Sequence, residues 1–403
     1  MSATEQLAPG APPPEEFVPL IVPEIRGNEW AYVKECLDTN WVSSVGSYVE
    51  RFERMVAERA GAKFAVATTN GTAALHIALL LAGVEQNDEV LVSSLTFIAP
   101  ANTIRYVGAW PVFIDADPSY WQIDPQRIED FLELDCVWQK GTLIRKGTGR
   151  RVRAILPVHI LGHPVDLDAI QQIAERFALP VVEDATEGLG AQYRNRSLGG
   201  IGDVGCFSFN GNKIITTGGG GMLVTNRQDW AERARYLTTQ AKDDPIEYVH
   251  GTVGYNYRLT NLLAAMGCAQ MENLDAYIEA KRSIAARYQA ALGCIPGITT
   301  PSEAEWATST YWMYTIRIDE RQTGIDARTL LRALHAKKIQ TRPLWQPMHL
   351  SPAHSSHQHP PCPVAEALHG SALSLPCSVG LSEADQDRVI DAIRGTIETN
   401  AVR

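Results

Sequence analysis

The chain has 403 residues, 45% of them hydrophobic and 20% charged, which is enough to bury a large core in more than one domain. Its formal net charge of −10 excludes a surface built to bind nucleic acids or anionic membranes through clustered lysine and arginine. The seven cysteines form no C-x-x-C pair, and no apolar run reaches the roughly 18 residues that cross a bilayer. We therefore expect a reduced, cytoplasmic protein with no membrane segment.

The elements expected from the sequence begin with a leader and a large domain. Residues 1–17 are rich in proline and are expected to form a flexible leader. In residues 18–270, short apolar runs alternate with helical patterns, which predicts an α/β domain of three α/β/α layers around a mainly parallel sheet. The runs expected to be strands are 65–67, 89–92, 111–114, 154–158 and 180–182.

The pattern changes in the last third of the chain. A single long helix is expected from residue 259 to about residue 292, as a hinge between domains. A strand over 311–316 and helices over 327–336 and 383–397 follow it. These elements predict a smaller C-terminal α+β domain over residues 271–403.

Two residues of the large domain suggest a cofactor. An apolar run that ends in Asp184 predicts a buried strand with a carboxylate at the carboxyl edge of the sheet, where open α/β folds bind ligands. Lys213 follows a second apolar run and precedes four glycines at 218–221. The carboxylate would keep the ring nitrogen of pyridoxal phosphate (PLP) protonated, and the lysine would form a Schiff base with the cofactor. Taken alone, Asp184 could cap a helix and Lys213 could be a solvated surface charge.

A small-residue turn suggests a phosphate site. Asn70, Gly71, Thr72 and Ala73 follow an expected strand and open a helix, so free backbone N–H groups and the threonine hydroxyl could bind an anion. An ordinary capped helix explains the same residues. The phosphate site is favoured because the turn, an aromatic loop with Phe97, the aspartate and the lysine occur in this order along the chain.

These motifs, together with those at 157–164 and 254–258, resemble the sugar-nucleotide aminotransferases, the DegT/DnrJ/EryC/StrS type of PLP-dependent enzyme with the aspartate-aminotransferase-like fold type I. The resemblance covers the chain from residue 18 to its C-terminus. The segments 209–217 and 254–258 are most similar to the subgroup that aminates 4-keto-6-deoxy-2-acetamido hexoses in legionaminic acid or bacillosamine synthesis. The alternatives are a C3- or perosamine-type aminotransferase of the same family and a non-catalytic PLP-binding protein.

The resemblance implies roles for individual residues. Lys213 would be the catalytic lysine, and Asn256 would reach the phosphate bound by the neighbouring subunit, which implies a homodimer with shared active sites. The residues implied to bind the cofactor are Lys213, Asp184, Glu187, Phe97, Gly71, Thr72, Ala73, Ser208 and Asn256. Those implied to contact the substrate are Trp41, Ser43, His159, Arg258, Arg342 and Trp345. His159 could equally be a structural histidine.

Two further features bear on the chemistry. Many members of the family carry His or Gln where Glu187 stands near the phenolic oxygen of PLP, so this carboxylate must be protonated or turned toward another donor. His354, His357 and His359 lie in a loop rich in proline and serine with Cys362 as the nearby thiol, and we expect no metal there. The implied reaction moves an amino group from L-glutamate to the C4 ketone of a nucleotide-linked 4-keto-6-deoxy sugar.

Overall fold

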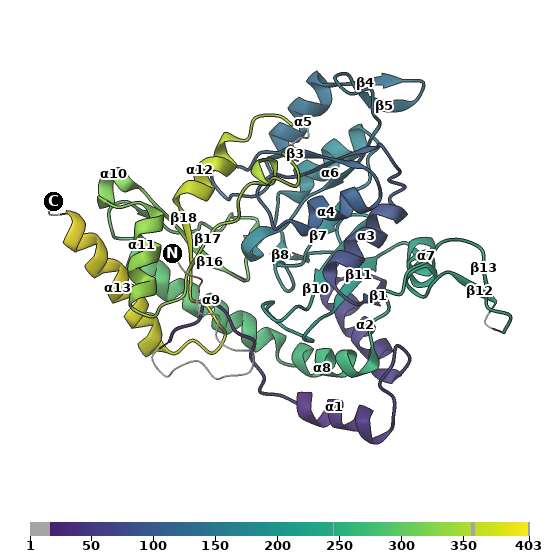
Figure 1. Ribbon diagram of the computed structural model, residues 1–403, viewed down its shortest axis with the longest axis horizontal. Coiled ribbons are helices and arrows are strands. Elements are labelled where there is room, and N and C mark those ends of the chain that lie inside the picture. The colour runs from purple at the N-terminus through teal and green to yellow at the C-terminus, as the bar shows by residue number, and fades with distance from the viewer. Residues whose placement is uncertain (1–16, 245, 356–358, 402–403) are drawn as a thin grey trace.

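The computed structural model describes residues 17–244, 246–355 and 359–401 (Figure 1). The expected leader over residues 1–17 lies outside these ranges, except for its last residue. Within the described ranges, no helix is both long enough and apolar enough to pass through a lipid bilayer.

A mostly parallel sheet forms the centre of the larger part of the molecule. Its strands are β1 (Phe64–Thr68), β2 (Glu89–Ser93), β3 (Trp110–Ile114), β6 (Val152–Leu156), β7 (Val182–Asp184), β10 (Val204–Ser208) and β11 (Gly221–Thr225). They pair in the orders β1-β11-β10-β7 and β3-β2-β6, and parallel bridges between 155 and 181 and between 158 and 184 join the two groups. β11 runs antiparallel to both of its neighbours, whereas the pairs β10–β7, β2–β3 and β2–β6 are parallel. The expected mainly parallel sheet is confirmed, and each expected run overlaps one of its strands.

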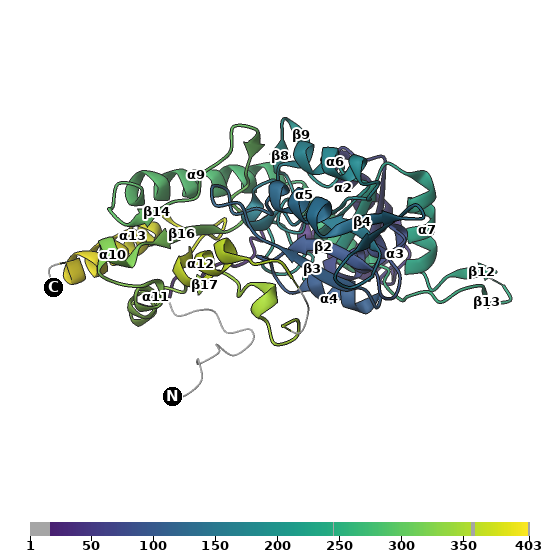
Figure 2. The same cartoon turned by 90° about the horizontal axis from the view of Figure 1, so that it is seen from above.

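Helices cover both faces of this sheet. They include α2 (Ser47–Ala60), α3 (Gly71–Leu81), α4 (Ala99–Tyr106), α5 (Pro125–Leu134), α6 (Leu167–Arg176) and α7 (Gln228–Thr238). Figure 2 shows α5 and α6 on one side of β2 and β3, and α4 on the other side. All residues of β2 and of β11 are buried, as expected for strands that are covered on both faces. This is the three-layer arrangement that the alternating sequence pattern predicts.

A second, smaller sheet lies in the C-terminal part of the chain. Its strands, in the order β14-β16-β18-β17, are β14 (Ile298–Thr299), β16 (Tyr314–Ile318), β18 (Ala372–Leu375) and β17 (Arg342–Pro343). The helices of this part are α9 (Leu274–Leu292), α10 (Glu320–Thr323), α11 (Ala327–Ala336), α12 (Pro363–Ser371) and α13 (Glu383–Ala401). α13 packs against both α9 and α11.

Short elements complete the described structure. They are α1 (Glu29–Asp38), β4 (Cys136–Gln139), β5 (Thr142–Arg145), the 3-10 helix η1 (Ile160–Gly162), β8 (Gln192–Tyr193), β9 (Arg196–Ser197), β12 (Lys242–Asp244), β13 (Val249–His250), α8 (Asn261–Met271), β15 (Ala307–Thr308) and the 3-10 helix η2 (Met348–Leu350). α8 packs against α1 and α2 at the edge of the larger part (Figure 1).

Three details differ from the sequence expectations. The helix expected over 259–292 is two helices, α8 and α9, because Asn273 leaves the helical conformation and its side chain donates to the carbonyl of Ala269. The strand expected from residue 311 begins at 314, because Tyr311 has a φ of 48° and its N–H donates to Ser309 Oγ. Val18 pairs with Ile339, so the first described residues lie against the C-terminal part and not with the large domain. The domain boundaries otherwise stay a prediction.

Candidate active site

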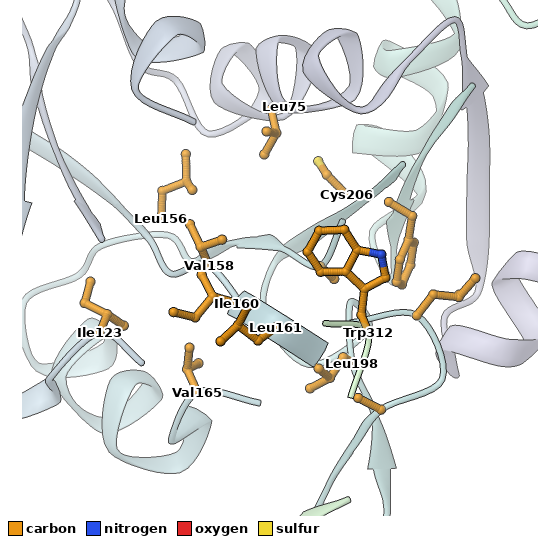
Figure 3. Packing of buried hydrophobic residues seen from close by; sticks show 14 of the residues in the cluster. Leu75, Ile123, Leu156, Val158, Ile160, Leu161, Val165, Leu198, Cys206 and Trp312 are labelled. Atoms are coloured by element: carbon orange, nitrogen blue, oxygen red, sulfur yellow. The ribbon is translucent and has the colours of Figure 1, made fainter. Parts of the chain in front are cut away.

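A cavity of about 340 Å³ opens at the carboxyl ends of β7 and β10, beside the start of α3. The sequence-predicted residues that line it are Gly71, Thr72, Phe97, Asp184, Glu187, Ser208, Lys213 and Trp345. Its apolar lining includes Leu75, Val158 and Trp312, which Figure 3 shows packed in one cluster with Leu156 and Cys206. The residue types at this sheet edge are those that the strand-end argument predicts.

Lys213 is held inside this cavity. It lies in the loop between β10 and β11, and its N–H donates to the carbonyl of Asn210, which closes a turn. Its side chain is 13% exposed, and Nζ lies 3.5 Å from Glu187 Oε1. The same Nζ lies 4.3 Å from the ring centroid of Trp312, a cation–π distance. A carboxylate and an indole face thus fix the position of the amine.

Asp184 is a buried carboxylate at the floor of the cavity. It ends β7, and its side chain accepts the N–H of Thr186 at 3.1 Å. Burial raises the pKa of Asp184, and the hydrogen bonds from Thr186 and the charge of Lys213 oppose that rise. A buried anion of this kind is stabilised by a cationic group placed against it. The floor is therefore suited to a protonated ring nitrogen.

Glu187 is turned toward two donors. Its Oε2 accepts the N–H of Leu161 at 2.8 Å, and its Oε1 faces Lys213. Burial raises the pKa of Glu187 to about 7, although the nearby Lys213 ammonium lowers it. The carboxyl group therefore changes its protonation state near neutral pH, which matches the requirement that it be protonated or bound to another donor.

The start of α3 forms the polar end of the cavity. Asn70 Oδ1 accepts the N–H of Ala73 at 2.7 Å, so this amide is already bonded. Ala73 was expected to bind the cofactor, but it does not line the cavity. Thr72 and Ser208 do line it. A Cβ added to Gly71 would lie 2.8 Å from Ser208 Cβ, so only glycine allows this close approach. Two hydroxyl groups and a helix N-terminus remain for an anion.

Trp312 is a site residue that the sequence analysis missed. Its indole N–H donates to the carbonyl of Asn212 at 2.8 Å, which ties the lysine loop to the segment before β16. The aromatic run around residue 312 predicts a strand, and its period gives no signal for a cavity. Thr186, Asn210 and Asn212 also line the cavity and were not predicted.

Five of the residues implied to contact the substrate lie outside the cavity lining of their own chain. His159 is fully buried, and its Nδ1 accepts the N–H of Val165 while Nε2 bonds to Glu183 at 3.1 Å. This geometry favours the structural alternative for His159. Arg258 forms an ion pair with the buried Glu53 and does not reach the cavity. The other residues outside the lining, Trp41, Ser43 and Arg342, are exposed.

Asn256 is also exposed and does not line the cavity of its own chain. It forms an isolated antiparallel bridge with Thr239 at the end of α7. The side chain is thus available to a second chain.

Comparison with known proteins identifies the family. The DegT/DnrJ/EryC1/StrS aminotransferase family matches residues 23–394, which include the whole cavity. The chain belongs to this family. GDP-perosamine synthase from Caulobacter vibrioides is 40% identical over 377 residues, which are 93% of this chain and 97% of the relative. The putative PLP-dependent aminotransferase EpsN from Bacillus subtilis is 38% identical over 386 residues, which are 94% and 96% of the two chains.

Solved structures of family members have the same fold. A DegT/DnrJ/EryC1/StrS aminotransferase from Brucella abortus superimposes with a TM-score of 0.83 at 30% identity and covers 91% of this chain and 95% of its own. DesV from S. venezuelae gives a TM-score of 0.82 at 33% identity and covers 92% and 94%. The predicted α/β fold of the PLP aminotransferases is confirmed.

The family members correct the predicted subgroup. Named relatives of high identity are GDP-perosamine synthases, from Caulobacter vibrioides and from Escherichia coli O157:H7, and not enzymes of legionaminic acid or bacillosamine synthesis. The subgroup prediction depended on residues 209–217, which surround Lys213, and on residues 254–258. If Lys213 holds the cofactor, the residues beside it would serve the cofactor whatever the sugar, so they would discriminate poorly between substrates.

The chain is thus a PLP-dependent nucleotide-sugar aminotransferase of this family. Its cavity fits PLP, because a lysine, a buried carboxylate and an anion-binding helix start surround one space. Lys213 would hold the cofactor, Asp184 would pair with its ring nitrogen, and Thr72 and Ser208 would bind its phosphate. When bound, PLP supplies an electron sink for the carbon that carries the amino group.

Proposed function

We propose that the enzyme transfers an amino group from L-glutamate to the C4 ketone of a GDP-linked 4-keto-6-deoxy sugar, the perosamine type of reaction. The names of its relatives support the nucleotide and the sugar, since several of them are GDP-perosamine synthases. The amino donor is proposed from the same family. This replaces the 2-acetamido sugar as the proposed acceptor.

The observation that carries the proposal is the position of Lys213 Nζ between Glu187 and Trp312. The amine lies beside the space in which an amino-bearing carbon would sit, so Lys213 can remove and return the proton at that carbon. Glu187 can compensate the positive charge of Lys213, because the Glu187 carboxyl group accepts the Leu161 N–H and titrates near neutral pH. Burial of the lysine limits the access of water to the reacting atoms.

The active enzyme is further proposed to be a homodimer with shared sites. Asn256 is exposed and lies outside its own cavity, as expected of a residue that serves a partner. The hairpin of β12 and β13 projects from the body of the molecule (Figure 2). Exposed apolar side chains on and beside it, Ile246, Tyr248, Val249 and Val253, would be covered by a second copy.

A two-step absorbance experiment tests the reaction and the sugar. The purified enzyme is treated with L-glutamate, freed of it, and then titrated with a panel of keto sugars while the visible band of the bound cofactor is followed. We expect glutamate to bleach the band and GDP-4-keto-6-deoxymannose to restore it. Restoration by a UDP-linked 2-acetamido-4-keto sugar alone would contradict the proposed acceptor. A band that glutamate leaves unchanged would contradict the donor.

Mixing two inactive variants tests the shared sites. Lys213→Ala and Asn256→Ala homodimers are dissociated together and reassembled. If Asn256 serves the partner's cavity, a mixed dimer has one site with both changes and one intact site, so activity returns. If Asn256 serves its own cavity, each site of the mixed dimer keeps one defect, and no activity returns. A mixture of Lys213→Ala with wild type sets the scale of reassembly.

A further inference from the structure

Three side chains away from the active-site cavity form a set of potential metal ligands. His349, His359 and Cys362 each offer one ligand atom, and these atoms lie within 4.8 Å of one another. The first residue belongs to η2, the second lies in the segment before α12, and the third is the N-cap residue of α12. From the sequence, no metal was expected at His354, His357 and His359, because they lie in a loop rich in proline and serine with Cys362 as the nearby thiol. His357 lies outside the described residues, and His354 Nε2 faces Asn102 Oδ1 at 3.1 Å.

The hydrogen bonds of the two histidines leave one lone pair on each ring. His359 Nδ1 lies 2.7 Å from the carbonyl oxygen of Pro360, which can only accept, so the hydrogen is on Nδ1 and Nε2 is free to bind a metal in the neutral ring. His349 Nε2 lies 3.0 Å from Glu366 Oε1, and the hydrogen there leaves the lone pair on Nδ1. That lone pair now faces the Ser94 hydroxyl at 2.8 Å.

The contact between His349 and Glu366 is typical of metal sites. A histidine that binds a metal usually donates its second ring hydrogen to a carboxylate or carbonyl, which fixes the ring and increases its basicity. Here the carboxylate of Glu366 has that position for His349, and the carbonyl of Pro360 has it for His359. Both rings are therefore already oriented as metal ligands.

Burial and donor type specify the kind of ion. Cys362 is 1% exposed and His349 is 4% exposed, whereas His359 is partly exposed and gives access from solvent. One thiolate and two imidazoles suit a borderline-soft ion of the zinc class. The three ligand atoms lie within 4.8 Å of one another. Tetrahedral ligands of zinc lie about 3.3–3.8 Å apart, so the separations between these atoms need to shorten by up to roughly 1.5 Å.

We propose that His349 Nδ1, His359 Nε2 and Cys362 Sγ bind one divalent ion of the zinc class, which fastens the start of α12 and η2 to the end of β2. The fourth position is taken by water or by Ser94 Oγ. On binding, the Cys362 S–H bond is replaced by a bond from sulfur to the metal, and the proton is released to solvent. η2 is already joined to the end of β2, since the Met348 N–H donates to the Ser94 carbonyl at 2.8 Å.

The site also has a structural consequence for catalysis. Trp345, which lines the active-site cavity, lies four residues before His349 in the same segment. The segment is anchored further by Asp115, whose carboxylate accepts the N–H groups of Val364 and Ala365 at the start of α12. An ion here would therefore stabilise the wall that carries Trp345, without contacting the substrate.

Cobalt titration of the tag-free holoenzyme tests the proposal. We expect one Co²⁺ per chain, with a thiolate-to-cobalt charge-transfer band and the visible bands of a tetrahedral ion, displaced by Zn²⁺. Cys362→Ser should abolish the charge-transfer band. His359→Gln, a change at a partly exposed position, should weaken binding about 10-fold or more while the protein stays folded.

Cys294→Ser and His335→Gln are matched controls, because both residues are exposed and lie outside the cluster. They should leave the titration unchanged. The proposal is overturned if wild type shows no stoichiometric cobalt band, or if the band persists in Cys362→Ser. It is also overturned if His359→Gln binds cobalt as tightly as wild type. Because the readout is metal binding, failure of the proposed aminotransfer would not affect it.

Discussion

Replacement of Glu187 by glutamine isolates the cost of a buried charge in the active site. In the protein without cofactor, burial raises the pKa of Glu187 from 4.5 to about 7. A change of this size corresponds to on the order of 3 kcal/mol between the two protonation states. Glutamine keeps an oxygen that can accept the Leu161 N–H, but it cannot ionise. The variant therefore represents the protonated carboxyl group at every pH.

The direction of the pH dependence follows from the raised pKa. The folded protein holds the proton more tightly than the unfolded chain, so the contribution of Glu187 to stability is fully present below pH 4.5 and is lost as the pH rises through about 7. Wild type should therefore lose on the order of 3 kcal/mol relative to Glu187→Gln between these limits. For a chain of 403 residues, this corresponds to a difference of about 3–4 °C in melting temperature.

Thermal unfolding of both cofactor-free proteins, from about pH 5 to about pH 8, measures this difference. Glu58→Gln is the matched control, because Glu58 is exposed on α2. Its melting curve should follow wild type throughout. If wild type and Glu187→Gln keep a constant difference over the whole range, Glu187 ionises without cost and the argument from burial is wrong.

Three other substitutions test further parts of the site. Asp184→Asn removes the buried anion at the cavity floor and should lower kcat about 100-fold or more, with weaker retention of PLP, as measured by turnover and by cofactor dissociation. Trp312→Phe keeps an aromatic face for Lys213 but loses the bond to Asn212, so it should cost about 1 kcal/mol of stability in urea unfolding. Asn70→Ala removes the cap of α3 and should cost about 1 kcal/mol, whereas unchanged stability would show that the cap is not needed.

The sequence predicts those parts of the molecule that depend on local patterns. Strands of the central sheet appear as apolar runs, and the carboxyl end of each parallel strand falls on one edge, so Asp184 and Thr72 could be placed together from sequence. The cap residue Asn70 was also recognisable, although its bond to Ala73 removes the amide that was expected to bind phosphate.

Contacts between residues far apart in the sequence were not predictable in the same way. Trp312 enters the cavity from the C-terminal part through a turn at Tyr311, which has a φ of 48°. Glu187 accepts the N–H of Leu161, which has a φ of 61° in η1, and no sequence pattern predicts this conformation. The break between α8 and α9 falls inside a continuous apolar pattern, so the period of the sequence hides it.

Lys213 is proposed to hold PLP, and the amino donor is proposed to displace it. Borohydride reduction of the holoenzyme, followed by proteolysis and mass spectrometry, measures which lysine carries the cofactor. We predict that the cofactor mass is found on the peptide with Lys213, and that it disappears from this peptide when the enzyme is treated with L-glutamate before reduction. Cofactor fixed to another lysine, such as the buried Lys281, or fixed to Lys213 regardless of glutamate, would contradict the account.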